Sequence, residues 1–315
     1  MIVPERMHAM PHIVVLGIFV ADTTFRATRM PRMGETILGD GFALGPGGKG
    51  SNQAVAAGRA GADVRFISRI GRDTFGDMAM QVWRDAGVGT DAVIRGEDAT
   101  GAAFIYVDSA SGDNAIIVAP GAAGKLTPAD IEAEADLIAG AAVFVTQLEQ
   151  PMDVALSGLR IARAGGAITL LNPAPAATLP EGMLELCDYV TPNETEAEAL
   201  SGVAVTDIDS ARAAGDALLE KGVGRAALLT LGAQGSLFHS AEQSIHIPAM
   251  SAGPVVETTG AGDAFNGGFA AALAEGADPV TAARFACAVA SLSVTRPGAA
   301  ASMPTRAEVE ALLAR

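Results

Sequence analysis

The stretch VETTGAGDAFNGGF at residues 256–269 places an acidic residue, Asp263, directly behind a run of four small residues. An Asp at the start of the apolar run DAFNGGFAAALAE is usually a helix N-cap, because its carboxylate accepts hydrogen bonds from the first turn. Capping does not explain the glycines. Gly260 and Gly262 let consecutive backbone N–H groups converge just before a helix N-terminus. The stretch therefore predicts a helix whose N-terminus forms an anion hole with a carboxylate beside it.

A carboxylate next to an anion hole repels a resting anion unless it has a task of its own. The task that fits is to accept a proton from a hydroxyl that attacks phosphorus. The backbone amides would then take the charge of the transferring group. For Asp263 the stretch leaves two interpretations, a simple helix cap and a catalytic base.

The composition limits the classes of protein that fit. The chain has 315 residues, half of them hydrophobic, which is enough for a sizeable core. Its formal net charge of −15 argues against binding to nucleic acid or to an anionic membrane, so a phosphate ligand must be held locally. We expect neither an export signal nor a membrane span, because no window offers about 18 consecutive apolar residues. Residues 1–10 are expected to be an extension.

The two cysteines indicate the redox compartment. Cys187 and Cys287 lie far apart, each within an apolar segment. Such a pair is more often two reduced core thiols than a disulfide. We therefore expect a cytoplasmic protein.

Short apolar runs alternate with helical stretches along the chain. Alternation of this kind predicts a parallel sheet covered on both faces. The candidate buried strands lie within residues 12–20, 64–71, 141–149, 166–173, 188–193 and 225–232.

Two segments break this rhythm. Residues 25–44 and 101–121 resemble hairpin-like pairs of strands, the second joined by the turn-rich SASGDN. We expect a small sheet inserted into a single domain over residues 11–315, with strands at about 23–45 and 100–120. Such a sheet closes over a ligand or forms a dimer edge, and both can hold at once.

The glycine-rich GPGGKG at residues 45–50 formally matches the GxGxxG dinucleotide pattern. The required context is missing, because the next strand, VRFIS, does not end in an acidic residue. The segment is not a P-loop either, since Gly50 separates Lys49 from Ser51. It does offer a flexible backbone that leads into a helix. Asn52 in the first turn of that helix is either a cap or solvated residue, or a polar ligand contact.

Taken together, these segments resemble the ribokinase family, the phosphofructokinase-B-like carbohydrate kinases. Its two signature regions are present, GGKGSNQAVAAGRAGA at 47–62 and TTGAGDAFNGG at 258–268. The segments QLEQP, LNPAPA, TPNETEAEAL, TLGAQG and VTRPGA follow in the family's order, so the similarity covers nearly the whole chain after residue 11. The resemblance implies a three-layer α/β fold with a mainly parallel central sheet and a small inserted β-sheet lid.

The resemblance also implies an ATP-dependent kinase that phosphorylates a primary hydroxyl of a pentose, with D-ribose as the first candidate and Mg²⁺ as cofactor. Asp263 would be the base, and the amides of Gly260, Ala261 and Gly262 would form the anion hole. The residues implied to bind the sugar are Asp22, Gly48, Lys49 through its backbone, Asn52, Glu149 and Asp263. Without the resemblance, Asp22 fits an ordinary turn carboxylate and Glu149 a solvated strand end.

The nucleotide side follows in the same way. The residues implied to bind ATP are Asn193, Glu196, Thr230, Gly232, Gly235, Gly262 and Cys287, of which the first two approach the phosphates and the Mg²⁺-bound water. Without the resemblance, the segment that contains Asn193 and Glu196 is a good helix start. A monovalent cation, K⁺, is implied beside the anion hole at Glu257, Thr259, Ser293, Arg296, Gly298 and Ser302. A homodimer through the lid sheet is implied as well.

Three positions depart from the family pattern. Val20 stands where an Asn commonly contacts the sugar, so ribose specificity is left open. Glu257 stands where an Asp usually supplies an oxygen to the cation, which leaves open whether K⁺ activates. Cys287 stands where a polar residue often lies near adenine, and nucleotide preference is not predicted.

Two other interpretations stay open. One is a kinase of the same family that acts on a ketohexose, 2-keto-3-deoxygluconate or a nucleoside, which Val20 favours. The other is a sugar- or nucleotide-binding regulator without turnover, against which the intact GAGD at 260–263 argues. The four histidines show no spacing typical of a metal site or a nucleophile.

Overall fold

The computed structural model describes residues 11–315, so the predicted N-terminal extension lies outside the described residues. A ten-stranded sheet forms the centre of the described chain, in the order β14-β13-β12-β11-β10-β9-β1-β4-β5, with β6 also paired to β4. All its pairs are parallel except β12 with β13 and β13 with β14. The predicted mainly parallel sheet is confirmed. Its strands are β1 His12–Leu16, β4 Asp63–Gly71, β5 Val88–Gly89, β6 Val93–Gly96, β9 Val143–Thr146, β10 Ile168–Leu171, β11 Tyr189–Val190, β12 Ala226–Thr230, β13 Ser236–Ser240 and β14 Ser244–Ile247.

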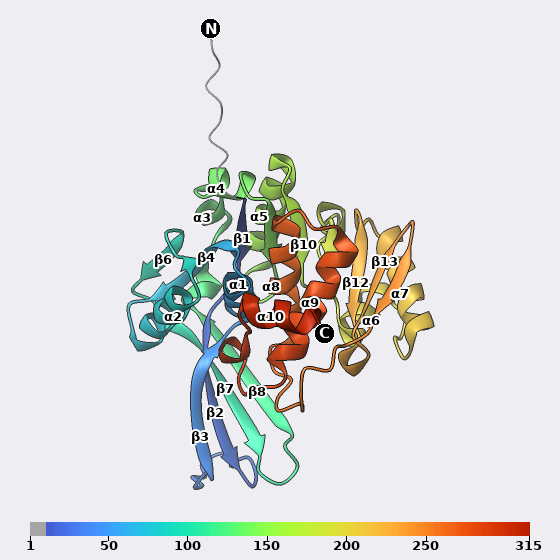
Figure 1. Cartoon of the computed structure of the whole chain (residues 1–315). Helices are drawn as coiled ribbons and strands as arrows, with labels where there is room; N and C mark the ends of the chain where they lie inside the picture. The colour runs from blue at the N-terminus through green and yellow to red at the C-terminus, as the bar shows by residue number, and fades with distance from the viewer. Residues whose placement is uncertain (1–10) are drawn as a thin grey trace.

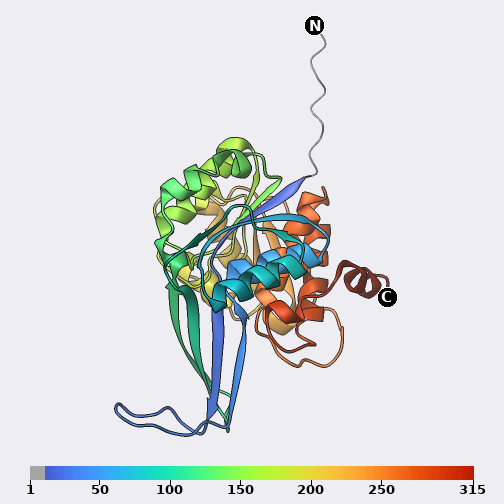
Figure 2. The same ribbon diagram turned by 90° about the vertical axis from the view of Figure 1, so that its left-hand side faces the viewer.

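Both faces of this sheet are buried. In β1, Ile13 and Val15 belong to one hydrophobic cluster, whereas Val14 and Leu16 belong to the other. Successive side chains of a strand point to opposite faces, so an unbroken apolar run requires helices on both sides. Figures 1 and 2 show this three-layer arrangement.

Each cluster is completed by its own helices. The first cluster includes residues of α1 Lys49–Arg59, α2 Thr74–Asp85, α8 Ala261–Ala274, α9 Pro279–Ser293 and α10 Arg306–Leu313. The second includes residues of α3 Pro128–Glu132, α4 Ala135–Ala139, α5 Met152–Gly165, α6 Glu194–Ser201 and α7 Ile208–Glu220. The described residues also form four short 3₁₀ helices, η1 Ala122–Lys125, η2 Leu184–Leu186, η3 Gly232–Gln234 and η4 Ala300–Ser302. No helix within residues 11–315 combines the length and apolar character that crossing a bilayer requires.

A second, four-stranded sheet projects from one end of this body (Figures 1 and 2). Its order is β3-β2-β7-β8, with β2 parallel to β7 and antiparallel pairs on either side. The two predicted strand pairs are thus joined edge to edge. The strands are β2 Val20–Ala27, β3 Gly41–Gly47, β7 Thr100–Asp108 and β8 Asn114–Gly121.

The first apolar run, residues 12–20, serves both sheets, which sequence periodicity did not predict. The central strand β1 ends at Leu16, and the small sheet begins at Val20. The backbone is closely packed at the break. A Cβ on Gly17 would lie 2.7 Å from Cα of Gly50, so the backbone at this point makes room for the first turn of α1.

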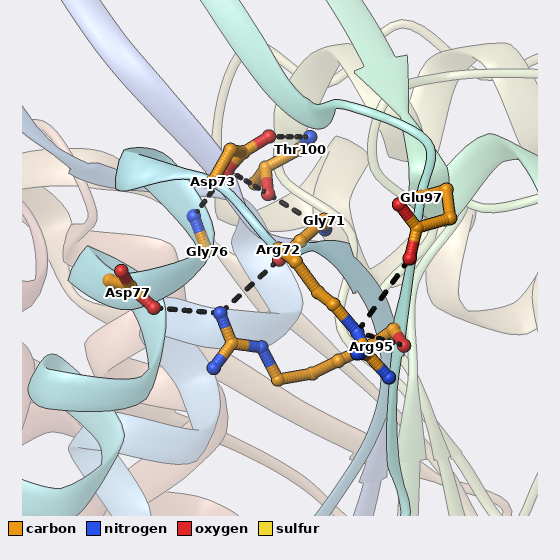
Figure 3. Close-up of polar contacts among 8 residues, drawn as sticks. All are labelled: Gly71, Arg72, Asp73, Gly76, Asp77, Arg95, Glu97 and Thr100. Carbon is orange, nitrogen blue, oxygen red and sulfur yellow. Dashed lines mark hydrogen bonds and ion pairs between the residues drawn. The ribbon is translucent and has the colours of Figure 1, made fainter.

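The base of the small sheet is fixed to the central sheet by a polar cluster (Figure 3). The Asp73 carboxylate accepts hydrogen bonds from the Gly76 amide at the start of α2 and from the Thr100 amide at the start of β7, at 2.8 and 2.7 Å. The Thr100 hydroxyl donates to Asp73 and accepts from the Gly71 amide at the end of β4. Beside them, Arg95 pairs with Asp77 at 2.7 Å. Any swing of the small sheet must turn about this end or break these bonds.

Candidate active site

Asp263 is not the cap of its helix. The N-cap of α8 is Gly260, in the left-handed region at φ 79°, and Asp263 is the third helical residue. Its side chain is only 7% exposed and its two oxygens accept hydrogen bonds from α1. Asn52 Nδ2 lies 2.9 Å from Oδ2, and Gln53 Nε2 lies 3.0 Å from Oδ1. The cap interpretations of both Asp263 and Asn52 are therefore wrong.

This contact joins residues 211 positions apart in the sequence. It exists because α1 packs directly on α8, with both helices in the first hydrophobic cluster. Asn52 is 5% exposed, and its Oδ1 atom is buried with no partner among the described residues. A buried acceptor without a donor is costly, so this atom fits a ligand hydroxyl that donates to it.

Further buried polar side chains lie beyond Asp263, along the carboxyl ends of the central strands. Gln147, Asn172 and Thr191 each directly follow a strand, β9, β10 and β11. Gln53 Nε2 donates to Asn172 Oδ1, and Asn172 Nδ2 donates to the Thr191 carbonyl, at 3.0 and 3.1 Å. Sequence reasoning missed these residues. The available signal was that polar residues at the carboxyl ends of parallel strands gather at one edge of the sheet.

Two more predicted residues bring carboxyl groups to the site. Burial, and then the charge of Asp263, raises the pKa of Asp22 to about 6. Burial raises the pKa of Glu149 to about 7, against the charge of Lys49 and the hydrogen bond from the Lys49 amide to Glu149 Oε2 at 2.7 Å. Hydrogen bonds donated by a ligand favour the charged form of a carboxyl group. The cluster therefore suits a ligand rich in hydroxyl groups.

The surroundings of Asp263 act on its pKa in opposite directions. Burial raises its pKa, while the charge of Lys49 and the hydrogen bonds from Asn52 and Gln53 lower it. The start of α8 supplies the predicted amides. The Ala261 amide donates to the Thr258 carbonyl at 3.1 Å, whereas the Gly262 amide lies in the first turn, where a helix provides no partner. Of the predicted anion-hole donors, Ala261 is thus engaged within the turn.

Most of the residues predicted for the nucleotide lie at the start of α6, at the end of β12 and in the turn that follows β12. Asn193 and Glu196 cap α6 reciprocally, each side chain accepting from the other's amide at 2.9 Å. The helix-start interpretation is therefore correct, and the predicted ligand role must act alongside it. Asn193 also forms a bridge with Thr230 at the end of β12. Gly232 and Gly235 follow in the next turn, both with positive φ.

Cys287 lies on α9, buried, with its sulfur 3.2 Å from the Ser236 hydroxyl of β13. Burial raises the pKa of its thiol, against a hydrogen bond from Ser236. Cys187 is buried as well, and both cysteines are free, as predicted. Cys287 is therefore a neutral thiol facing the turn that contains Gly235.

The two segments predicted to hold a monovalent cation lie side by side. Glu257 Oε2 accepts from the Gly298 amide at 2.9 Å, and the Glu257 amide donates to the Val294 carbonyl at 3.2 Å. Three further side chains of the set are engaged elsewhere. Arg296 pairs with Glu308, and the hydroxyls of Ser293 and Ser302 donate to nearby carbonyls. Within residues 11–315 no group of three or more His, Cys, Asp or Glu side chains could hold a metal ion.

Comparison with known proteins identifies the family. A sequence profile described as pfkB family carbohydrate kinase matches residues 10–306. The chain belongs to the pfkB family of carbohydrate kinases. The predicted family, fold and kinase class are confirmed.

Several relatives within the pfkB family match almost end to end. The ribokinase of Haemophilus influenzae is 40% identical over 297 residues, which cover 94% of this chain and 96% of the relative. The ribokinase of Staphylococcus aureus is 40% identical over 300 residues, with 94% and 98% covered. The structure of Arabidopsis thaliana ribokinase complexed with ribose and ATP is similar at a TM-score of 0.90, with 31% identity over 97% of this chain and 99% of that one. Whole-chain similarity assigns no role to a single residue, so the individual roles of the pfkB site residues stay predictions.

Proposed function

We propose that this protein transfers the γ-phosphoryl group of ATP to a primary hydroxyl of D-ribose, giving ribose 5-phosphate. Support comes from the two bacterial relatives named ribokinase and from the Arabidopsis structure, whose description names ribose and ATP. The observation that carries the proposal is the buried Asp263 carboxylate at the N-terminal turn of α8, held by Asn52 and Gln53.

In this proposal Asp263 is the base. The sugar hydroxyl binds beside its carboxylate and gives up its proton as the oxygen attacks the γ-phosphorus. The amides of Gly260 and Gly262, that of Ala261 once it releases the Thr258 carbonyl, and the dipole of α8 would stabilise the charge on the transferred group. Positioning and charge neutralisation supply most of the catalysis in phosphoryl transfer.

The sugar is held between the two sheets. Asp22 of β2, Asn52 of α1 and Glu149 after β9 accept hydrogen bonds from its hydroxyls, while Gly48 and Lys49 contribute backbone groups. Val20 packs in a small apolar cluster with Ile18, Ala103 and Ala123, so it offers no polar contact. Recognition of the sugar hydroxyls therefore rests on Asp22, Asn52 and Glu149.

ATP would bind over the loops that contain Asn193, Glu196, Thr230, Gly232 and Gly235, with Cys287 near the base. Mg²⁺ bound to the phosphates neutralises their charge during transfer. Glu196 would hold its water shell through Oε1, which the capping bond leaves free, and Asn193 through the second lone pair of Oδ1. K⁺ would bind at the contact between residues 257–259 and 293–302, to which Glu257 contributes a carboxylate.

The small sheet would act as a lid that covers the sugar and excludes water, which competes for the phosphoryl group.

The lid also gives a homodimer interface. Its strands carry exposed apolar side chains that a monomer would leave in water, namely Phe25, Phe42, Leu44, Ile116, Ile117 and Val118. Phe25, Phe42, Leu44 and Ile117 share one face of the sheet, and exposed apolar surface of this kind is typical of an interaction site. The reduced state of Cys187 and Cys287 supports a cytoplasmic location.

Sedimentation equilibrium tests the interface. We expect a dimer for the unchanged protein and a monomer for Phe42→Lys, because Phe42 is 61% exposed on β3 and a charge there would be buried in the interface. Met33→Lys is the matched control. Met33 is fully exposed on the connection between β2 and β3, outside the strands, and its replacement should leave the dimer intact. A monomer at every concentration of unchanged protein would refute the interface.

ADP release with Mg-ATP tests the proposed reaction. The acceptors are ribose, deoxyribose, ketohexoses, 2-keto-3-deoxygluconate and nucleosides, each with and without K⁺. We expect the highest kcat/KM with ribose and little ATP hydrolysis without sugar. Preference for another acceptor would make this a different kinase of the family. Binding of ATP without turnover of any acceptor would favour a regulator, and the K⁺ response decides the role of Glu257.

A further inference from the structure

Both polar atoms of the Gln53 side chain, beside Asp263, are hydrogen-bonded to neighbouring side chains. Its side chain is completely buried on α1. Nε2 donates to Asp263 Oδ1 and to Asn172 Oδ1, both at 3.0 Å, and Oε1 accepts from Gln147 Nε2 at 2.6 Å. An amide group has two donor hydrogens on nitrogen. Both are used, so Gln53 has no donor left for a substrate.

The orientation of this amide is dictated by a chain of neighbours that ends on the backbone. The Thr191 carbonyl can only accept, so Asn172 must turn Nδ2 toward it. Asn172 Oδ1 then faces Gln53, which must present Nε2. A flipped Gln53 would set Oε1 against the oxygens of both Asn172 and Asp263. The N–H directed at Asp263 Oδ1 is therefore determined by the carboxyl end of β11.

The same series of hydrogen bonds continues from Thr191 to α8. The Thr191 hydroxyl donates to Asn266 Oδ1 at 2.6 Å, and Asn266 Nδ2 donates to the Gly262 carbonyl at 2.8 Å. One continuous set of hydrogen bonds thus links the carboxylate of Asp263 with the backbone next to it. These hydrogen bonds fix α1, α8 and the ends of the strands relative to one another.

Asn52 and Gln53 differ in what they leave free. Asn52 keeps a buried oxygen without a partner, which suits a ligand hydroxyl. Both polar atoms of the Gln53 side chain already have partners. We propose that Gln53 is a positioning residue, which sets the side chain of Asp263 through Nε2 and does not contact the substrate. The inference rests on the proposed role of Asp263 as the base.

The test replaces Gln53 by Met, which has a similar length but neither donor nor acceptor. The matched control is Ser51→Ala. Ser51 is also fully buried on α1, but its hydroxyl accepts from Trp83 Nε1 at 2.9 Å. Both variants leave one buried polar partner or more unsatisfied, so both should lower the midpoint of thermal unfolding. Only the Gln53 variant should change the ionisation of Asp263.

The first readout is the ionisation of Asp263, followed by ¹³C NMR of labelled carboxyl groups and assigned with Asp263→Asn. Loss of a hydrogen bond to a carboxylate favours the protonated form. We expect its titration midpoint to rise by about 1 to 2 pH units in Gln53→Met and to stay in place in Ser51→Ala. This readout needs no turnover, so it remains decisive if ribose phosphorylation is not found.

The second readout is kcat with ribose as a function of pH. We expect the acid limb of kcat to move to higher pH and kcat at neutral pH to fall about 10-fold, with the KM for ATP nearly unchanged. The charged groups around Asp263 are the same in both variants, namely Lys49, Asp22, Glu149 and Glu196.

Gln53→Glu is the second variant, in case the Met substitution prevents folding. It keeps an acceptor for Gln147 but removes the donor to Asp263 and adds a like charge, so the Asp263 midpoint should rise further than with Met. If the Gln53 variants lose stability as Ser51→Ala does while the Asp263 midpoint and the acid limb stay where they are, Gln53 is merely structural and the inference is wrong.

Discussion

Asp263→Asn is expected to lower kcat with ribose by at least about 100-fold, with ATP affinity close to that of the unchanged protein. A carboxamide cannot take the proton of the sugar hydroxyl. It also has one acceptor oxygen where the carboxylate has two, so the N–H group of either Asn52 or Gln53 loses its partner. Steady-state kinetics and calorimetric titration with ATP measure the two quantities.

The matched control is Asp278→Asn. Asp278 is the exposed N-cap of α9 and accepts hydrogen bonds from the amides of Val280 and Thr281. Asparagine caps a helix as well as aspartate does, so kcat should stay the same. If Asp263→Asn kept a near-normal kcat, Asp263 would not be the base, and the hydrogen bonds around it would be structural.

The sequence predicted the features that depend on local pattern. Short apolar runs marked the central strands, because a strand buried on both faces needs no polar alternation. The two irregular segments marked the small sheet. The pattern did not predict where the run 12–20 divides, at the point where Gly17 packs closely against the first turn of α1.

The site was predicted residue by residue but not as an arrangement. Asn52 and Asp263 were both singled out, each with a helix cap as the alternative, because either type is common at helix starts. What overturned the caps is contact between helices 211 residues apart, which no local period encodes. Gln53 was missed for the same reason. A glutamine early in a helix looks solvated until α8 covers it.

The second large effect is expected at that helix contact, from Gly267→Ala. A Cβ on Gly267 would lie 2.5 Å from Cβ of Ala56 and 2.6 Å from the Gln53 carbonyl, both on α1. Backbone and short side chains cannot swing away, so the helices must separate. Overpacking of this kind costs about 1–3 kcal/mol of unfolding free energy, more than the roughly 1 kcal/mol that Ala gains over Gly in a helix.

Separation of α1 from α8 also draws Asn52 and Gln53 away from Asp263. Small misplacements of catalytic groups cost up to about 100-fold in rate, so we expect a fall in kcat of that order together with the loss of stability. Urea unfolding and kcat with ribose measure both effects on the same preparation.

Gly262→Ala is the control for stability on the same helix. Beyond its chain neighbours and the backbone of its own helix, a Cβ on Gly262 would have no heavy atom of residues 11–315 within 4 Å, so only the helix-propensity gain should remain. We expect it to unfold at the same or a higher urea concentration than the unchanged protein. Equal stability of the two glycine variants would mean that α1 and α8 can separate without cost. The amide contacts would then adapt to the helices, and the close packing of the helices would not be what sets the position of Asp263.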